Sequence, residues 1–248
     1  MKKIFLIIVV VIIFMIIVSV FQNRPQAILS RLNEKEEIAW GNMKFRIYLF
    51  GLFPVAEATL DNAEPQILNG KVLLYLKMKA NTLPVFNKFY CAEATLESYI
   101  DKASGNPVFF KQQLFTSGKD SIVKELTYDQ VNKIMVLNGI KRDILPDTQD
   151  PLSLVYNLIT KDYLKKMVFS FNFNANQKNY LFDAMCSRKD GVVIANAKIS
   201  RRDNNPYHKS EATFVFIEGK RNIPILFKIF ASGAYLTVRL VEITPVTA

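Results

Sequence analysis

Apolar and polar residues alternate along most of this chain, from about Trp40 to its end. Met43 and Phe45, for example, alternate with Lys44 and Arg46. A period of two residues places successive side chains on opposite faces of a β-strand. Gly, Asn, Asp and Pro residues separate the alternating segments. The pattern predicts a mainly β fold of about ten to twelve short strands, a meandering antiparallel sheet curled into a half-barrel or barrel.

The alternation defines where the strands should lie. The alternating segments, in which the strands are expected, are residues 43–49, 56–61, 71–79, 92–100, 108–115, 122–128, 133–137, 167–174, 180–187, 192–200, 212–218, 223–230 and 234–243. Two of them, on either side of Asp129 and Gln130, are expected to form a hairpin.

One segment has helical spacing instead. Asp150 can cap a helix whose first position is Pro151. The apolar residues that follow form one stripe, made of Leu152, Val155, Leu158 and Ile159. We predict one short helix over residues 151–160, packed on the sheet.

The N-terminus carries an almost unbroken apolar run. Residues 4–18 are all apolar, and after Ser19 the run continues to Phe21. As a helix, this run would be about 27 Å long, close to the ~30 Å hydrocarbon core of a bilayer. Two lysines precede it, which favours a cytoplasmic N-terminus and export of the remainder.

The chain is therefore expected to have three parts. Residues 1–21 are predicted to form a transmembrane signal-anchor that inserts through residues 4–21, residues 22–39 a juxtamembrane stalk, and residues 40–248 a single β-rich domain. The predicted location is the cytoplasmic membrane, single-pass, with the bulk in the periplasm or outside the cell. A cleaved signal peptide is the alternative, although the bulky residues after Ser19 make a poor cleavage site.

Charge adds a second possibility for partners. The formal net charge is +10, and residues 161–221 hold 12 basic and 6 acidic residues. Such an excess can favour lipid headgroups or an anionic envelope polymer. It is also typical of a solvated sheet surface with lysines at strand edges. Nucleic acid is not an expected partner, because no dense basic run occurs.

Catalytic motifs are not found in the sequence. His208 is the single histidine, and the chain contains no G-x-S-x-G elbow and no phosphate-binding glycine loop. The spacing of histidine and cysteine offers no metal site. Glu93 and Glu97, four apart on a strand, would stand about 13 Å apart, too far for paired-carboxylate chemistry. We expect no enzyme, no metal and no cofactor.

Candidate binding residues surround the predicted helix start. Asp147 and Asp150 are expected to cap the helix, and the alternative is that their loop, with Tyr128 and Ser153, lines the mouth of a ligand site. Cys91 and Cys186 form an even pair in a chain that is expected to be exported. They are either a disulfide or two free thiols within strands.

The aromatic residues allow a further alternative. The chain has 19 Phe and 10 Tyr. Most are expected in the core, but a curled sheet with a larger interior than its side chains fill would hold an acyl chain or a similar guest.

Several segments resemble a bacterial family, domain-of-unknown-function family 3108. The segments that carry the resemblance are 43–60, Glu97-Ser98-Tyr99-Ile100-Asp101 with Asn106-Pro107, Thr127-Tyr128-Asp129, 145–153 with its Gln149-Asp150-Pro151-Leu152-Ser153 element, and the end of the chain from Arg221 to Ile243. The resemblance covers about residues 40–245. It implies an envelope β-protein and brings no established activity or binding residues.

These observations favour a membrane-anchored envelope protein without enzymatic activity. Its preferred role is a binding or scaffolding module, with a lipid-like guest as one version. The alternative is a module that binds a protein or a polyanion through an outer face of the sheet. The sequence does not indicate which protein would be the partner.

Overall fold

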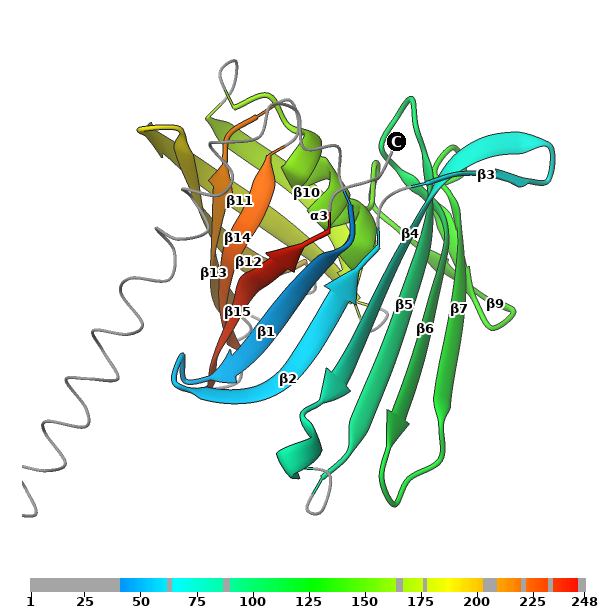
Figure 1. The fold of residues 1–248 in the computed structure, drawn as a ribbon. Helices are drawn as coiled ribbons and strands as arrows, with labels where there is room; N and C mark the ends of the chain where they lie inside the picture. The colour runs from blue at the N-terminus through cyan, green and yellow to red at the C-terminus, as the bar shows by residue number, and fades with distance from the viewer. Residues whose placement is uncertain are drawn as a thin grey trace, which may run out of the picture. The chain divides into compact units, whose positions relative to one another are not determined.

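One antiparallel sheet contains every strand of the part of the chain that the structure describes (Figure 1). The computed structural model describes residues 41–61, 64–86, 90–163, 167–175, 178–202, 209–219, 222–231 and 234–244. All of them belong to one compact unit, Trp40–Ala248. The strands are β1 (Met43–Leu49), β2 (Phe53–Leu60), β3 (Glu64–Leu68), β4 (Lys71–Thr82), β5 (Ala92–Asp101), β6 (Pro107–Thr116), β7 (Ile122–Asp129), β8 (Ile134–Leu137), β9 (Ile140–Asp143), β10 (Val168–Ala175), β11 (Lys178–Lys189), β12 (Val192–Arg201), β13 (Lys209–Ile217), β14 (Ile223–Ala231) and β15 (Ala234–Ile243).

The strand order shows that the sheet is a meander with two free ends. It runs β10-β11-β12-β13-β14-β15-β1-β2-β4-β5-β6-β7-β8-β9, and β3 pairs only with β4. The pairing of β1 with β15 joins the beginning of the β-domain to its end. The predicted antiparallel meander is confirmed, but the strands do not close into a complete ring.

The loop that follows β9 brings the two ends of the sheet together. The backbone of Gln149 donates to Asn172 O and accepts from Asn174 N, each at 2.8 Å, so the loop forms a parallel bridge to β10. Asn172 Nδ2 also donates to Pro146 O at 2.9 Å. Loop backbone therefore covers the β10 edge, where a further strand would lie in a closed barrel.

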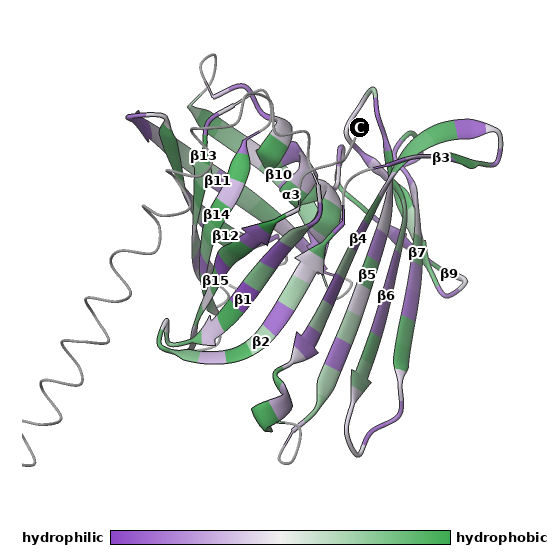
Figure 2. Ribbon diagram, in the orientation of Figure 1, coloured by the Kyte–Doolittle hydropathy of each residue, from purple (hydrophilic) through white to green (hydrophobic). Residues whose placement is uncertain are grey.

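The two faces of the sheet differ in hydropathy, as the alternating colours along β1 and β15 show (Figure 2). The inner face carries the core. Its fully buried members include Leu76, Ile100, Phe182, Val193 and Phe216. Aromatic rings form much of the core, because Phe216 stacks on Tyr163 and meets Phe227 edge to face. Several aromatic residues thus fill the interior, as expected from burial of apolar area, whereas Phe50, Phe53, Tyr90, Phe115 and Tyr235 are exposed.

The single α-helix of the described region is α3 (Pro151–Thr160), with the predicted bounds, and a short 3-10 helix, η1, covers Pro84–Phe86. Asp150 is its N-cap and Pro151 occupies the first turn, both as predicted. Buried Leu152, Leu158 and Ile159 pack the helix against β4, β5 and β10. At the other end Asn222 Nδ2 donates to the carbonyls of Ile159 and Lys161, which satisfies helix-terminal acceptors.

The predicted anchor at 1–21, the stalk at 22–39 and His208 lie outside the described residues. Within the described ranges, no helix has the length and apolar character needed to cross a membrane.

The disulfide alternative is corrected by the structure, since Cys91 and Cys186 are both free thiols. Cys91 directly precedes β5, whereas Cys186 lies in β11, many strands away in the sheet order. Burial raises the pKa of the Cys186 thiol to about 11, so it stays protonated near neutral pH.

Candidate functional site

A cavity of about 150 Å³ lies on the inner face of the sheet, between β5–β8, the start of α3 and the end of β10. Its lining combines apolar and polar side chains. These are Leu96, Phe110, Gln112, Lys124, Leu126, Tyr128, Leu137, Pro151, Asn174 and Ala175. A dry cavity of roughly this volume holds a molecule the size of benzene in another protein. The site is thus large enough for a guest of about six or seven non-hydrogen atoms and smaller than the ~300–1,000 Å³ of a typical ligand pocket.

A charged side chain lies on the apolar inner face at this cavity. Lys124 belongs to β7 and shares its face with Leu126 and Tyr128, because the three are two residues apart. On the neighbouring strand Gln112 pairs directly with Lys124 and lines the same cavity. A lysine and an amide therefore reach a wall that is otherwise made mostly of leucine and phenylalanine.

Two further polar groups of the cavity have unsatisfied hydrogen-bonding capacity. Tyr128 is 7% exposed, and its hydroxyl finds no partner among the described residues. Asn174 is 3% exposed; its Nδ2 donates to Asn179 at 3.0 Å, while its Oδ1 has no partner in the same part of the chain. An unpaired buried polar group costs about 1–3 kcal/mol. The two atoms, one able to donate and one able only to accept, therefore favour a polar guest.

The Tyr128 hydroxyl stays neutral in this environment. Burial, and secondarily the nearby Asp150 carboxylate, raise the pKa of Tyr128 well above its ordinary value. Tyr128 can therefore act as a hydrogen-bond donor throughout the physiological pH range.

Asp150 and Ser153 lie beneath the cavity and form a capping box. Asp150 Oδ1 accepts from the backbone N–H of Leu152 at 2.7 Å and of Ser153 at 2.9 Å. Ser153 Oγ in turn accepts from Asp150 N at 2.8 Å. The other carboxylate oxygen of Asp150 accepts from Ser98 Oγ of β5 at 2.6 Å. Both residues are fully buried and act within the fold, so the capping role is confirmed for Asp150.

Asp147 and Tyr128, the other two predicted candidates, lie in different surroundings. Asp147 is exposed, with a φ of 53°, and accepts from Asn106 Nδ2 at 2.9 Å. It ties the loop before α3 to the β5–β6 turn and does not line the cavity. Of the four predicted mouth residues, Tyr128 alone belongs to the lining of this cavity.

The buried Asp150 makes stability depend on pH. Burial raises its pKa to about 6, against the opposing effect of hydrogen bonds from Ser98 and from the helix start. In the unfolded chain the pKa of aspartate is about 3.9. The protonated Asp150 carboxyl therefore makes its full contribution to the free energy of unfolding below about pH 4. This contribution is lost as the pH rises through 6.

We expect the Asp150→Asn variant, which cannot titrate, to isolate this effect. Relative to the variant, the free energy of unfolding of the natural protein should fall by about 2 kcal/mol between pH 4 and pH 7.5. Urea unfolding of both proteins across this range measures the difference. Parallel pH profiles for the two proteins would contradict the assignment.

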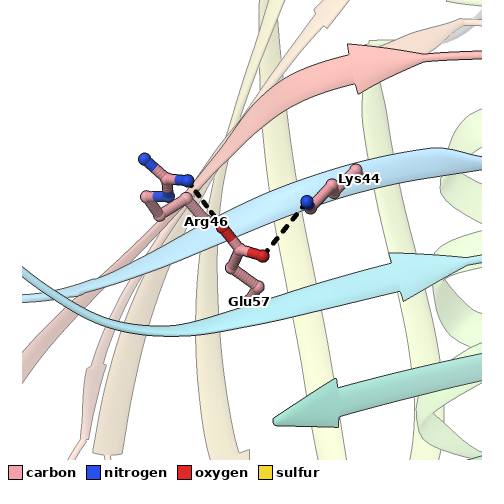
Figure 3. A network of polar contacts seen from close by, with 3 residues as sticks. All are labelled: Lys44, Arg46 and Glu57. Atoms are coloured by element: carbon pink, nitrogen blue, oxygen red, sulfur yellow. Dashed lines mark hydrogen bonds and ion pairs between the residues drawn. The ribbon is translucent and has the colours of Figure 1, made fainter. Parts of the chain in front are cut away.

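The outer face of β1 and β2 has a different character, because Lys44, Arg46 and Glu57 form ion pairs there. Glu57 of β2 bonds Arg46 at 2.5 Å and Lys44 at 3.1 Å, both on β1 (Figure 3). The hydrogen bond from Arg46, and after it the contact with Lys44, holds the pKa of Glu57 below its ordinary value, although burial opposes this effect.

The same alternation continues across the neighbouring strands. Four charged residues face one another in register on β4 to β7, namely Lys77, Glu97, Lys111 and Glu125. Lys77 forms an ion pair of 3.0 Å with Glu97, and Lys111 forms one of 2.9 Å with Glu125. This row is neutral overall, and exposed pairs of this kind contribute only about 0–1 kcal/mol each. The outer face of these strands thus offers no continuous basic surface.

Possible metal ligands and paired carboxylates can be located in the described part of the structure. In that part, no group of three or more His, Cys, Asp or Glu side chains is arranged to hold a metal ion. Glu93 and Glu97 both lie on β5, and Glu97 is engaged by Lys77 and Tyr75.

Three polar residues of the cavity, Gln112, Lys124 and Asn174, were not among the predicted site residues. Lys124 could have been recognised from the strand pattern. Ile122, Leu126 and Tyr128 lie at intervals of two residues from it, so they share its strand face, and they are apolar or aromatic. A lone charge on the buried side of a strand is unusual unless it is paired or functional. For Asn174 the sequence gives no such signal, because the cavity arises where β10 meets β7 and α3.

The fold and the cavity together define a β-sheet domain with a small amphipathic site on its inner face. Among solved structures, the chain is similar to the crystal structure of a beta-barrel-like protein of the domain of unknown function DUF1849 from Brucella abortus. The TM-score is 0.60 at 8% sequence identity, and the match covers 84% of this chain and 100% of that chain. No protein-family pattern and no curated protein matches the chain.

At this identity the likeness concerns the fold alone. It supports a β-domain of the beta-barrel-like kind. The match does not extend to domain-of-unknown-function family 3108, so membership of that family stays a prediction.

Proposed function

We propose that the chain is a membrane-anchored protein of the bacterial envelope that binds a small amphipathic guest in its inner-face cavity without catalysing a reaction. The observation that carries the binding role is the pair of unsatisfied buried atoms, Tyr128 Oη and Asn174 Oδ1, in a wall that is otherwise mostly apolar. Apolar walls with a few convergent polar groups are the usual composition of ligand sites.

The volume of the cavity selects among guests. A whole acyl chain needs the larger volume of a typical ligand pocket, whereas about 150 Å³ suits a small molecule or the end of a chain. Of the lipid-like guests that the sequence suggested, we therefore propose a compact amphiphile. On β1–β2 and β4–β7 the polyanion alternative gains less support, because Lys44, Arg46, Lys77 and Lys111 are paired there with glutamates.

Membrane attachment is supported by the apolar run at residues 4–21. The exposed side chains of the β1–β2 turn add to it, since Phe50, Leu52 and Phe53 are 55%, 46% and 60% exposed. The backbone N–H of Phe50 donates to Tyr235 O, so the exposed Tyr235 near the start of β15 lies beside them. Clustered aromatic and aliphatic side chains of this kind are common at membrane interfaces. A reporter enzyme fused to the C-terminus should be active outside the cytoplasm, and activity only in the cytoplasm would contradict the envelope location.

Native mass spectrometry of the full-length protein, gently extracted from the envelope, tests the binding role. We expect an adduct of low mass on the natural protein. Ala175→Leu, which adds bulk to the cavity wall, should remove most of the adduct. Thr127→Leu, on the exposed outer side of β7, is the matched control and should retain it. A bare natural protein, or equal adducts on both variants, would contradict the proposal.

A further inference from the structure

Several neighbouring connections at one end of the sheet carry large, exposed apolar side chains. The antiparallel order places the β1–β2, β4–β5, β6–β7 and β14–β15 connections at the same end of their strands. The first three lie along the lower margin of the sheet in Figure 1, and Figure 2 shows hydrophobic residues at the β1–β2 turn and in η1. The exposed side chains of this margin, here called the apolar rim, are those of Phe50, Phe53, Val85, Tyr90, Ile122 and Tyr235.

Backbone hydrogen bonds join these connections into one continuous border. The β1–β2 turn is bonded to the start of β15, as described above. Leu83 N donates to Val55 O at 2.9 Å and thereby ties the β4–β5 connection to β2. Ser117 N donates to Cys91 O at 2.8 Å, and Cys91 N donates to Ser117 Oγ at 3.2 Å, which ties the β6–β7 turn to the β4–β5 connection. The apolar tips therefore lie next to one another in a fixed order.

The rim also differs from the opposite end of the sheet in charge. In the described residues of its connections, the charged side chains are those of Lys119 and Asp120, which are adjacent in the chain and opposite in sign. The β5–β6, β7–β8 and β11–β12 connections at the other end contain Lys102, Lys133 and Asp190. A contiguous exposed apolar surface is typical of a site that contacts a protein or a membrane.

The form and composition of the rim favour a lipid bilayer over a protein as the partner. Its side chains stand on separate turns and on a short helix, and apolar side chains on such tips can enter the soft boundary between headgroups and acyl chains. Tyr90 and Tyr235 combine an apolar ring with a polar hydroxyl, as do the aromatic residues that are enriched at membrane interfaces.

The chain before the sheet is long enough for the rim to reach the membrane that the predicted anchor would enter. β1 begins at Met43, and the rim lies at the far end of this strand of 7 residues, about 23 Å away. Residues 22–42, if fully extended, would span about 70 Å. The length of this segment therefore allows the rim to contact the same bilayer.

We propose that the apolar rim docks on the lipid bilayer, with its side chains about 5–10 Å deep at the boundary between headgroups and acyl chains. This inference rests on the membrane attachment in the proposed function and is independent of the guest of the cavity. Because the described connections of the rim carry no net charge, docking depends on apolar contact and needs no anionic lipid.

Quenching of tryptophan fluorescence by brominated acyl chains tests the docking in the full-length protein, reconstituted into phosphatidylcholine vesicles. Trp40 is the single tryptophan, so Trp40→Phe provides the background for reporters. We expect the reporters Phe53→Trp and Ile122→Trp, both in the rim, to lose more than about half of their emission. Val131→Trp is the matched control, because Val131 is 89% exposed at the opposite end of the sheet, and it should keep its emission.

A second set of variants tests whether the rim acts as a unit. Phe50→Ser together with Phe53→Ser should reduce the quenching of the Ile122→Trp reporter at least about twofold. Ile67→Ser removes a side chain that is equally apolar and exposed, but on β3 outside the rim, and should leave the quenching unchanged. The quenching should also persist in about 1 M salt, where electrostatic attraction is screened.

The outcomes separate the docking from the membrane anchor. If the protein floats with the vesicles while the rim reporters keep their emission, docking is overturned and the anchor stands. Failure to float with the vesicles would overturn both. Equal quenching of the Val131→Trp control, or quenching that is lost in high salt, would contradict docking through the apolar rim. Blue-shifted rim reporters without quenching would show that protein, such as a second copy of the chain, covers the rim instead.

Discussion

Replacing Asp150 by alanine is expected to lower the free energy of unfolding by about 3 kcal/mol at pH 5. The substitution removes the acceptor for the N–H groups of Leu152 and Ser153, and it leaves Ser98 Oγ in the core without its 2.6 Å partner. Loss of a helix cap costs about 0.5–2 kcal/mol, and a stranded buried hydroxyl adds about 1–3 kcal/mol. In a domain of this size the melting temperature should fall by about 6–12 °C, which differential scanning calorimetry measures.

Asp150→Asn is the matched control for this substitution at the same pH. Its Oδ1 can still accept from the helix start, and its Nδ2 can donate to Ser98 Oγ. We expect it to stay within about 1.5 kcal/mol of the natural protein at pH 5. If alanine were as stable as asparagine, the link between the helix start and β5 would contribute little to the fold.

Gly105→Ala should destabilise the protein by about 3 kcal/mol through a different mechanism. Gly105 has a φ of 73°, and an added Cβ would lie 2.7 Å from Asn157 Oδ1. Asn157 Nδ2 donates to Gly105 O, Gln149 Oε1 and Ser153 O, so displacing this amide disturbs the joint between the β5–β6 turn and α3. The left-handed backbone alone costs a side chain about 1–2 kcal/mol.

Gly191→Ala separates the two costs of Gly105→Ala, which are the left-handed backbone conformation and the contact with Asn157. Gly191 has the same φ of 73°, but no atom lies within 4 Å of its added Cβ. Urea unfolding should give it only the backbone cost of about 1–2 kcal/mol. Equal losses for the two variants would show that the contact with Asn157 is not important.

Most of the strands were predictable because one of their two faces is buried. In β7, for example, buried Leu126 and Tyr128 alternate with exposed Glu125 and Thr127, which is the pattern that a period of two detects. The helix was predictable to the residue because Asp150 and Pro151 have specific roles at a helix start.

The two strands that sequence reasoning missed lack this signal. All four residues of β9 are exposed, three of them charged, so no buried face produces an alternation. β3 contains Pro65 and pairs only with β4 at the margin of the sheet, where a proline is tolerated. Short strands at the margins of the sheet are stabilised by pairing more than by burial.

The site was predictable only in part, for a geometric reason. Tyr128 was among the predicted site residues. Lys124 could have been predicted as well, because it shares its strand face with apolar residues of β7. The cavity itself requires β7, β10 and the start of α3 to meet, and backbone bonds of Gln149 join the segment before α3 to β10. Backbone hydrogen bonds between distant segments leave no periodic pattern in a sequence.

The most direct test of the account uses leucine-methyl NMR of the full-length protein in lipid nanodiscs, before and after addition of a small-molecule extract of the bacterial envelope. We expect the methyl signals of Leu96, Leu126 and Leu137, which line the cavity, to shift. The signals of Leu52 and Leu236, which are 46% and 38% exposed outside it, should stay in place. Unchanged cavity leucines, or shifts confined to the exposed ones, would contradict a binding site on the inner face of the sheet.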